Sequence, residues 1–338
     1  MKAIQIPSPG DLRVVALPEP QPAPGEVKLR LHYVGFCGSD LNTFLGRNAM
    51  AKPQVIPGHE IGATIEALGE GCPDTLHVGQ TVTVNPYTNC GVCAACRNRR
   101  PNACQHNETL GVQRDGAMRE FFCLPWQKVI PVDGISTRDA ALIEPMSVGF
   151  HAVSRGGVTD CDTVVVFGCG MVGLGAVIRS VQRGAVVIAV DLSREKLDLA
   201  REAGATYTIN SGEENLQEKV LEYTGGLGAD VVIEAVGSPV TYVSAIDVVS
   251  FTGRVVCIGY AKSEVSFQTK YFVQKELDIR GSRNALPEDF RAAVRAIQHS
   301  SLPMDRFVSA VVTPEETLDA MQRWAAAPAQ VFRILVEF

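Results

Sequence analysis

Four cysteines in one short segment have the types and the spacing to hold a metal ion: Cys90, Cys93, Cys96 and Cys104. Four thiolates from a short loop can surround one tetrahedral Zn²⁺. A disulfide pair is the plainer alternative. An iron–sulfur cluster is a third, but the fourth cysteine is distant in sequence and no proline follows it. The pattern therefore favours zinc, in a closed site with a structural role.

A second pattern with chemical meaning is the G-x-G-x-x-G spacing of Gly168, Gly170 and Gly173. It follows a strand-like run over 163–167 and opens an apolar, helix-length segment. The first glycine permits a tight turn, the second lets a pyrophosphate approach the backbone, and the third lets helix and strand pack closely. N–H groups at the start of the helix then face the phosphate charge.

Asp191 ends the next strand-like run and is placed to accept hydrogen bonds from an adenosine ribose. Together these parts form a βαβ unit that predicts dinucleotide binding, although a plain parallel-sheet crossover has a similar outline. An acid at this position repels a 2′-phosphate, so NAD is favoured. Arg194, close by, leaves NADP as the less favoured alternative.

Hydrophobic periodicity places these motifs in two kinds of structure. Residues 1–35 and the segments around 61–67 and 81–85 resemble an irregular β-rich domain. Regular alternation of strands and helices begins at residue 163 and predicts a doubly wound parallel sheet. The expected strands are 163–167, 185–190, 206–209, 229–236, 253–260 and 276–280. Helices over 287–300 and 314–327 then precede a last strand, 333–338, which we expect to rejoin the first domain.

Composition narrows the function classes. With 338 residues the chain suits two domains, and 46% hydrophobic residues are typical of a soluble globular protein. The net charge of −6 argues against nucleic acid or an anionic membrane as a partner. No secretory signal is visible, so we expect a cytoplasmic protein whose ten cysteines serve metal or redox chemistry before disulfides.

Three isolated residues could add a second metal site: Cys37, His59 and Glu144. Each has an ordinary alternative. A lone cysteine is usually a small buried hydrophobe, a lone histidine is more often a hydrogen-bonded structural residue, and Glu144 could simply lie near a helix N-terminus.

The order and spacing of the motifs decide between these interpretations, because together they resemble the zinc-dependent medium-chain alcohol dehydrogenase family. The resemblance covers the chain from about residue 1 to 338. It rests on CGSD at 37–40, GHE at 58–60, the four-cysteine segment at 90–104, DG at 115–116, LIEP at 142–145 and the glycine motif at 168–173. Glu144 stands where classical members have cysteine, as in the polyol and sugar-acid branch. GSRNALPEDF at 281–290 is similar to bacterial L-galactonate and L-gulonate 5-dehydrogenases.

The resemblance implies an α/β fold in two domains. A β-rich GroES-like catalytic domain is expected over 1–147 and 284–338, with a structural zinc lobe at about 88–106. A Rossmann NAD-binding domain is expected over 148–283.

The resemblance also implies roles for single residues. Cys37, His59 and Glu144 match catalytic zinc ligands, and Glu60 matches an acid that can enter or leave the coordination sphere. Ser39 matches the hydroxyl that takes the proton from the substrate alcohol, while the histidine of many relatives' outer proton path is Asn42 here. The expected cofactor contacts are Gly168, Gly170, Met171, Val172, Gly173, Asp191, Arg194, Val236, Ile258 and Ser282.

These roles imply two zinc ions per chain, NAD, and hydride transfer from an alcohol. The first prediction is oxidation of a secondary hydroxyl of a sugar acid such as L-gulonate or L-galactonate. Arg283, followed by Asn284, is the candidate for holding the substrate carboxylate, because a planar guanidinium pairs well with that group. An ion pair within the protein or a ribose contact is the alternative for Arg283.

Other functions stay open at this point. A polyol dehydrogenase of sorbitol, galactitol or threonine-dehydrogenase type would use the same mechanism. A non-catalytic NAD(H)-binding protein would be expected to lack a zinc ligand or Ser39. This chain has Ser39 and all three expected zinc ligands, Cys37, His59 and Glu144. A zinc-finger nucleic-acid binder would be expected to be basic. Relatives of this family are dimers or tetramers, so a homodimer or homotetramer is expected.

Overall fold

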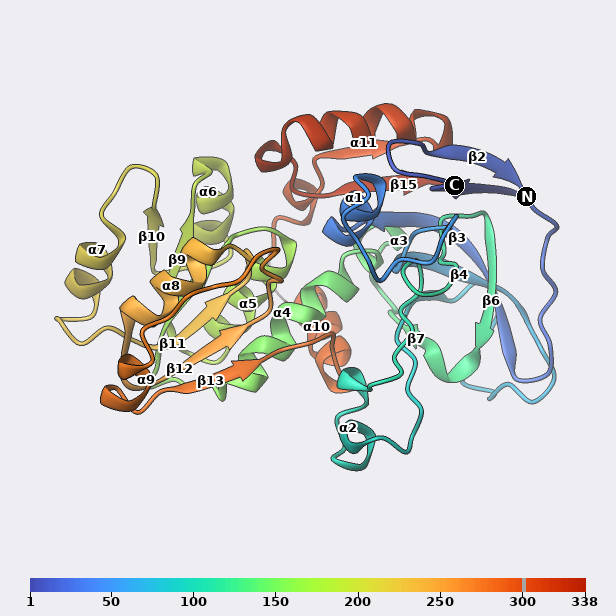
Figure 1. The fold of residues 1–338 in the computed structure, drawn as a ribbon. Helices are drawn as coiled ribbons and strands as arrows, with labels where there is room; N and C mark the ends of the chain where they lie inside the picture. Colours follow the sequence, from blue (N-terminus) through green and yellow to red (C-terminus); the bar gives the residue numbers. More distant parts are fainter. Residues whose placement is uncertain (300–301) are drawn as a thin grey trace. The chain divides into compact units, whose positions relative to one another are not determined.

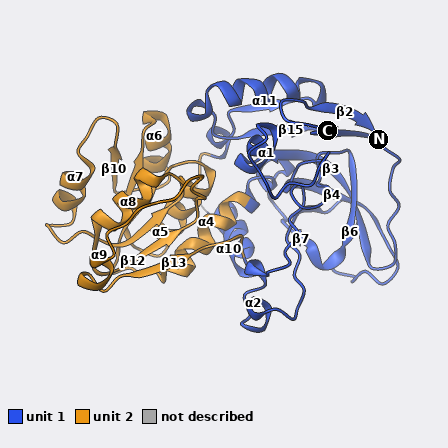
Figure 2. Cartoon of the chain, viewed as in Figure 1, with its two compact units in different colours: residues 1–144, 286–300, 304–338 blue, residues 145–285, 301–303 orange. Residues whose placement is uncertain are grey.

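The structure is a computed structural model that describes residues 1–299 and 302–338, in two compact units. Unit 1 contains Met1–Glu144, Leu286–Ser300 and Met304–Phe338, and unit 2 contains Pro145–Ala285 and Ser301–Pro303. Figure 2 gives each unit its own colour. Helix α4 (Ile143–Gly156) carries the chain from the first unit into the second.

Unit 1 is built on a seven-stranded sheet whose longest strand is β3 (Glu26–Phe36). The strand order is β14 (Ala310–Val312), β15 (Ile334–Glu337), β3, β4 (Glu60–Leu68), β5 (Thr81–Val84) and β7 (Val129–Pro131), with β6 (Phe121–Pro125) also paired to β3. A small sheet joins β1 (Lys2–Gln5) to β2 (Arg13–Ala16). The last strand, β15, pairs antiparallel with β3 and so lies in unit 1; the sequence predicts only that the C-terminal strand returns to the first domain, and not its partner.

The helices of unit 1 are short, apart from two near the C-terminus (Figure 1). They are α1 (Gly38–Phe44), α2 (Ala94–Arg97), α3 (Thr137–Ala140), α10 (Pro287–His299) and α11 (Thr317–Ala326). α10 matches the helix expected over 287–300, whose last position lies outside the described residues. The helix expected over 314–327 is divided, because Pro314–Glu316 form a 3₁₀ turn before α11 begins.

Unit 2 is a six-stranded parallel sheet in the order β10-β9-β8-β11-β12-β13. Its strands are β8 (Thr163–Phe167), β9 (Val186–Asp191), β10 (Tyr207–Asn210), β11 (Ala229–Glu234), β12 (Val249–Cys257) and β13 (Asp278–Gly281). Its other helices are α5 (Met171–Gln182), α6 (Arg194–Glu202), α7 (Leu216–Tyr223), α8 (Pro239–Val248) and α9 (Lys270–Gln274). This order, in which the first strand lies beside the fourth, is that of a doubly wound dinucleotide-binding fold. The predicted fold class is therefore confirmed.

The predicted strands of unit 2 differ from the observed ones mainly at their ends. β8 has the predicted bounds, whereas β12 ends at Cys257, three residues earlier than expected. The reason is a close approach of two glycine loops, since a Cβ on Gly259 would lie 2.2 Å from the Gly237 nitrogen. Residues 258–260 therefore form a loop against Gly237 and leave the sheet.

Among the described residues, no helix has both the length and the apolar character needed to span a membrane.

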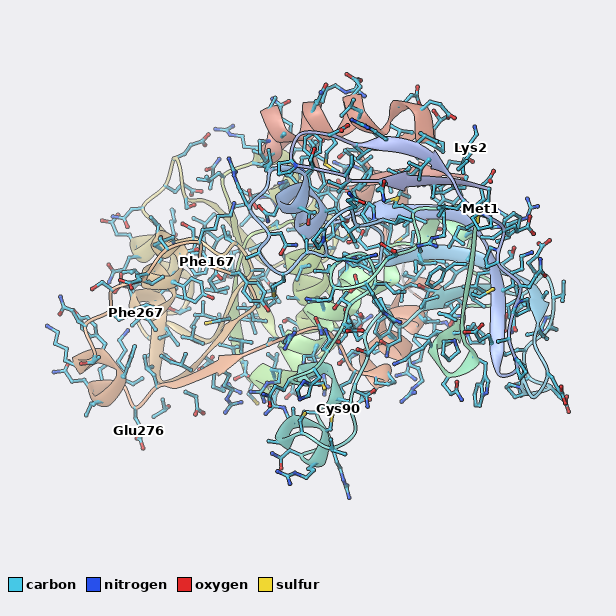
Figure 3. All side chains as sticks on the ribbon, turned by 45° about the vertical axis from the view of Figure 1, so that its right-hand side comes forward. Met1, Lys2, Cys90, Phe167, Phe267 and Glu276 are labelled. Carbon is cyan, nitrogen blue, oxygen red and sulfur yellow. The ribbon has the colours of Figure 1, made fainter. Side chains whose placement is uncertain are left out.

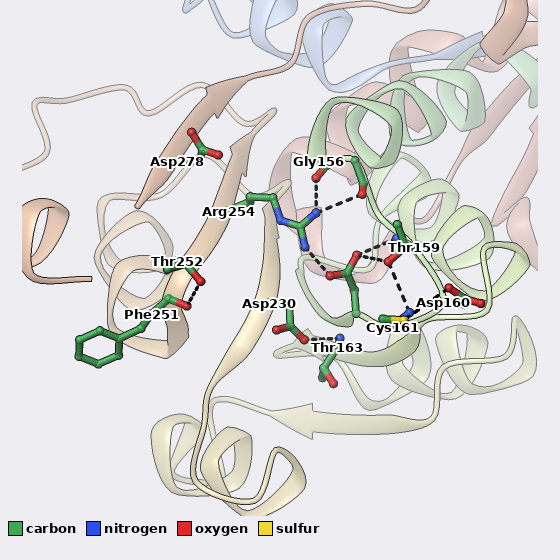
Figure 4. Close-up of polar contacts among 12 residues, drawn as sticks. Gly156, Thr159, Asp160, Cys161, Thr163, Asp230, Phe251, Thr252, Arg254 and Asp278 are labelled. Carbon is green, nitrogen blue, oxygen red and sulfur yellow. Dashed lines mark hydrogen bonds and ion pairs between the residues drawn. The ribbon is translucent and has the colours of Figure 1, made fainter. Parts of the chain in front are cut away.

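A mostly buried ion pair fastens the start of unit 2 to its sheet (Figure 4). The guanidinium of Arg254 on β12 pairs with Asp162 and donates to the carbonyls of Gly156, at 3.0 Å, and Gly157, at 3.1 Å. The Asp162 carboxylate also accepts the Thr159 N–H at 2.7 Å and its hydroxyl at 3.1 Å. Arg254 thus satisfies two carbonyls at the end of α4, and its partner Asp162 holds the turn before β8.

Replacing Arg254 by methionine is expected to lower the free energy of unfolding by about 3 kcal/mol, because Asp162 is left buried without its cation. Urea unfolding, followed by circular dichroism, measures the loss. Lys219→Met is the matched control, since it removes an ion pair with Glu222 whose carboxylate is 59% exposed, and exposed pairs contribute less than about 1 kcal/mol. Equal midpoints for the two variants would contradict the prediction.

Candidate active site and metal centres

The four cysteines of the 90–104 segment converge on one point in unit 1. The sulfur of Cys93 lies 3.6 Å from that of Cys96 and 3.8 Å from that of Cys104, and Cys104 and Cys90 sulfurs are 3.6 Å apart. Figure 3 marks Cys90 in the lobe that carries α2. These separations are well beyond a disulfide bond of about 2.05 Å, and none of the four cysteines is paired as a disulfide.

These separations fit a tetrahedral zinc ion. A Zn–S distance of about 2.3 Å places neighbouring sulfurs about 3.8 Å apart. Backbone N–H groups point at the sulfurs, from Cys93 to Cys90 at 3.4 Å and from His106 to Cys104 at 3.3 Å. Backbone hydrogen bonds lower the pKa of the Cys93 thiol to about 6, whereas burial and the hydrogen bond with Cys93 raise that of Cys96 to about 11. Binding of a metal, which takes the thiolate form, would therefore release a proton from Cys96.

A second group of ligand types gathers where β3 and β4 lie side by side. Cys37 follows β3 directly and occupies the N-cap of α1, where its N–H donates to Asp40 Oδ2 at 2.8 Å. His59 and Glu60 lie at the start of β4. The ligand atoms of Cys37, His59 and Glu60 all lie within 4.8 Å of one another.

Strand register makes room for this group. Gly35 is the direct partner of Glu60 across the β3–β4 pair, and a Cβ at residue 35 would lie 2.2 Å from Glu60 Oε2. The glycine therefore lets a fully buried carboxylate lie over the neighbouring strand.

Arg333, one residue before β15, supplies a cation to the same carboxylate. Its guanidinium lies 3.0 Å from Glu60 Oε1 and donates to the Phe36 carbonyl at 2.7 Å. Arg333 is 5% exposed and Glu60 is fully buried. A buried carboxylate needs such a partner to stay charged.

Glu144 lies outside the group of three and is held by a different residue. It is in the first turn of α4 and 4% exposed, and its Oε1 accepts a hydrogen bond from the hydroxyl of buried Tyr87. The family resemblance implies Glu144 as the third ligand and Glu60 as an acid that can enter or leave the coordination sphere, whereas Glu60 is the carboxylate that lies with Cys37 and His59. The roles of both acids stay predictions.

Burial and neighbouring charges shift the pKa values of two acids and of the histidine around this group. Burial raises the pKa of Glu144 to about 7 and that of Asp40 to about 6. Burial lowers the pKa of His59, but the hydrogen bond to Cys37 and the charges of Cys37 and Asp40 outweigh it, so the net pKa lies well above its usual value. Without a metal, the site thus keeps protons that a divalent cation would replace.

Unpaired buried atoms support the same interpretation. Among the described residues, His59 Nδ1, Ser39 Oγ and Glu60 Oε2 have no hydrogen-bond partner. Such buried groups are costly unless something binds them. Thiolate, imidazole and carboxylate are the donor set of zinc sites, so the residues fit a zinc ion.

The nucleotide motif of unit 2 has the geometry that the glycine spacing predicts. Gly168 has a φ of 85°, and a Cβ on Gly173 would lie 1.7 Å from the Gly168 carbonyl oxygen. Gly170 is the N-cap of α5 without a side-chain cap, and a Cβ there would meet nothing within 4 Å. The turn, the close packing and an open helix N-terminus are therefore all present, with Met171 and Val172 in the first turn of that helix.

Asp191, the last residue of β9, is fixed by three N–H groups. Its carboxylate accepts from Cys169 at 2.7 Å, Leu192 at 2.8 Å and Ser193 at 2.9 Å. Arg194 forks onto Glu213 at 2.6 and 3.2 Å. Its guanidinium is thus already paired with a carboxylate, which favours NAD over a 2′-phosphorylated cofactor.

The remaining cofactor candidates follow the carboxyl ends of three neighbouring strands. Val236 follows β11, Ile258 follows β12 and Ser282 follows β13. Fully buried Glu234 positions the first of these loops, because its Oε1 accepts the N–H groups of Val236 at 3.0 Å and Gly237 at 2.8 Å. Ligands of doubly wound sheets bind at this edge.

The substrate candidates Arg283 and Asn284 come directly after Ser282, at the end of unit 2. Asn284 has a φ of 54°, a left-handed conformation that asparagine tolerates better than most residues. The turn therefore redirects the chain away from the sheet just after Arg283.

Three residues of the candidate site were missed in the sequence analysis: Gly35, Tyr87 and Arg333. Arg333 and Gly35 reach Glu60 only through strand pairing between distant segments. Tyr87 lies three residues before Cys90, and nothing in the local pattern distinguishes it. The alternation of apolar and polar residues along β3 is the one sequence signal that could have placed Gly35 beside a partner strand.

Comparisons with known proteins agree with this geometry. Residues 23–134 match the alcohol dehydrogenase GroES-like domain, and residues 172–299 match the zinc-binding dehydrogenase domain. A sorbitol dehydrogenase of Halalkalibacterium halodurans is 33% identical over 91% of this chain and 90% of its own. An L-galactonate-5-dehydrogenase of Escherichia coli is 32% identical over 86% and 85%.

A solved structure of an alcohol dehydrogenase is also similar to this chain. The rspB protein of Escherichia coli, described as a short chain alcohol dehydrogenase and complexed with NADH, is 28% identical. It superposes with a TM-score of 0.91 over 100% of this chain and 99% of its own.

The chain thus belongs to the zinc-dependent alcohol dehydrogenase family, among its polyol and sugar-acid dehydrogenases. It is an oxidoreductase that uses zinc and a nicotinamide dinucleotide.

Proposed function

We propose that this protein oxidises a secondary hydroxyl of a sugar acid, such as L-gulonate or L-galactonate, to the ketone. The observation that carries the catalytic part is the group of half-buried Cys37 with buried His59 and Glu60, whose ligand atoms lie within 4.8 Å of one another. The sugar-acid part is supported by the E. coli L-galactonate-5-dehydrogenase relative and by the place of Arg283 after β13.

The residues have the following proposed roles. Cys37 and His59, with Glu60 or Glu144, hold the catalytic zinc, and Cys90, Cys93, Cys96 and Cys104 hold the structural one. When bound, zinc lowers the pKa of an alcohol, and NAD accepts the hydride. Ser39 Oγ, which has no partner among the described residues, accepts the proton of the substrate hydroxyl and passes its own proton outward to solvent.

The chain's other residues bind and orient the cofactor. The turn of Gly168, Gly170 and Gly173 receives the pyrophosphate, and Asp191 accepts hydrogen bonds from the adenosine ribose. Val236, Ile258 and Ser282 border the nicotinamide half. The carbon-bound hydrogen then leaves as hydride and the hydroxyl hydrogen leaves as a proton, so the substrate loses two electrons in all.

A polyol is the second candidate substrate, because the sorbitol dehydrogenase relative is as similar as the L-galactonate-5-dehydrogenase. A panel of aldonic acids and neutral polyols, followed by NADH absorbance, separates the two. Turnover of aldonic acids supports the proposal, and turnover of neutral polyols alone would replace it with the polyol function.

Arg283→Ala tests the carboxylate contact. If the acid is the substrate, its KM is expected to rise about 10- to 100-fold, the equivalent of one lost hydrogen bond to a charged group. A neutral polyol turned over by the same variant serves as the control, and its KM is expected to stay within about twofold. An unchanged KM for the acid would refute the contact.

We further propose a homodimer or homotetramer and a cytoplasmic location. None of the ten cysteines is paired as a disulfide, which supports a reducing compartment. Size-exclusion chromatography with light scattering determines the assembly.

A further inference from the structure

Tyr87 links the loop of the four-cysteine lobe to one of the acids expected at the other candidate metal centre of unit 1. It follows β5 by three residues and precedes Cys90 by three, in the loop that leads to the four-cysteine lobe. Its side chain is buried, with 4% exposure, and its hydroxyl donates to Glu144 Oε1. A residue of the loop thus reaches Glu144, a predicted ligand of the mixed-ligand site, by which we mean the candidate zinc site of Cys37, His59, Glu60 and Glu144.

The backbone of Tyr87 is fixed from both sides. Its N–H donates to Asn85 Oδ1 at 3.1 Å, and its carbonyl accepts from Lys128 Nζ at 2.6 Å. Its ring packs edge-on against Phe290, with centroids 6.3 Å apart at 61°. Because backbone and ring are both held, the hydroxyl has little freedom to move away from Glu144.

The two acids of the site are held by different kinds of partner. Glu60 lies beside the Arg333 cation, while Glu144 is bound by a neutral phenol. A neutral phenol fixes a carboxylate in space and adds no positive charge that would compete with a metal ion for it. A carboxylate with one oxygen bound by the protein can serve the metal with the other.

We propose that Tyr87 is a positioning residue, whose hydroxyl holds the Glu144 carboxylate in the orientation that the mixed-ligand metal site requires. The inference rests on the proposed function only in that it takes Cys37, His59, Glu60 and Glu144 as the metal site. It adds a residue outside the predicted ligand set.

The test is Tyr87→Phe, which removes the hydroxyl and keeps the ring. Tyr33→Phe is the matched control, because the Tyr33 hydroxyl also donates to a carboxylate, Glu337 Oε1 at 2.7 Å, in the same unit but among exposed groups. Zinc per chain is measured by elemental analysis after dialysis against buffers of graded free zinc. The equivalent that Cys37→Ser loses identifies the mixed-ligand site.

Tyr87→Phe is expected to bind that equivalent about 10- to 100-fold more weakly than the parent, as for other residues that orient metal ligands. The visible spectrum of the Co²⁺ form should change as well, because the geometry around the ion changes. Tyr33→Phe should match the parent in both measurements. A merely structural tyrosine would lower thermal stability and leave affinity and spectrum unchanged.

The outcomes separate this inference from the proposed function. Parent-like affinity and spectrum in Tyr87→Phe overturn the role of Tyr87 alone. A parent protein that binds a single zinc, insensitive to Cys37→Ser, overturns both the inference and the catalytic metal site. Two bound zinc ions without turnover of any polyol or sugar acid overturn the proposed function, while the metal measurements still decide on Tyr87.

Discussion

Replacing Cys37 by serine is expected to reduce turnover by about 10³- to 10⁴-fold. A catalytic metal contributes several kcal/mol of stabilisation to the developing negative charge, and each 1.36 kcal/mol corresponds to a factor of ten. Serine keeps the size of the side chain but is a much poorer zinc ligand than a thiolate. The loss should therefore come from the metal and leave the fold of β3 and α1 intact.

Steady-state kinetics and zinc analysis together check this expectation. The variant should retain the zinc of the four-cysteine lobe and lose the other. Cys123→Ser is the control, because Cys123 on β6 is a half-buried free thiol outside both cysteine-containing clusters. Full turnover in Cys37→Ser, or the same loss in the control, would contradict a metal role for Cys37.

The second large effect is expected from Gly173→Ala. The added Cβ would lie 1.7 Å from the Gly168 carbonyl oxygen and 2.9 Å from its carbonyl carbon. These are backbone atoms that cannot rotate away, so the turn between β8 and α5 must open. We expect a stability loss of about 1–3 kcal/mol and an NAD affinity reduced by at least about 100-fold, because the pyrophosphate site is part of that turn.

Gly170→Ala separates the two effects. A Cβ at Gly170 meets nothing within 4 Å, and its φ of −68° suits any residue. The unfolding midpoint of this variant should therefore equal that of the parent. Its NAD affinity should still fall, because the methyl group occupies the space through which the pyrophosphate approaches. Calorimetric titration with NAD and thermal unfolding of both variants measure this, and unchanged NAD binding in both would refute the nucleotide site.

Local patterns predicted the nucleotide fold well. The β8 strand, the glycine turn and Asp191 are close in sequence, and a single βαβ unit determines their relative positions. The four-cysteine lobe is local for the same reason, since its ligands lie within 15 residues from Cys90 to Cys104.

The surroundings of the mixed-ligand site could not be predicted in this way. Arg333 reaches Glu60 because β15 pairs with β3, although the two residues are far apart in sequence. The Gly35–Glu60 pairing depends on a register with irregularities along β3 and β4, which no periodicity specifies. Tyr87 depends on the course of an irregular loop.

The most direct test of the claim that this protein is a zinc-dependent dehydrogenase is NADH formation. It is measured with the best substrate of the panel, before and after removal of zinc by a chelator. We predict turnover in the zinc-loaded protein, loss of turnover after chelation, and recovery when Zn²⁺ but not Mg²⁺ is restored. Turnover that survives complete removal of zinc would contradict a zinc-dependent mechanism. So would the absence of turnover across the whole panel by a zinc-loaded protein that binds NAD, which would favour a non-catalytic NAD(H)-binding role.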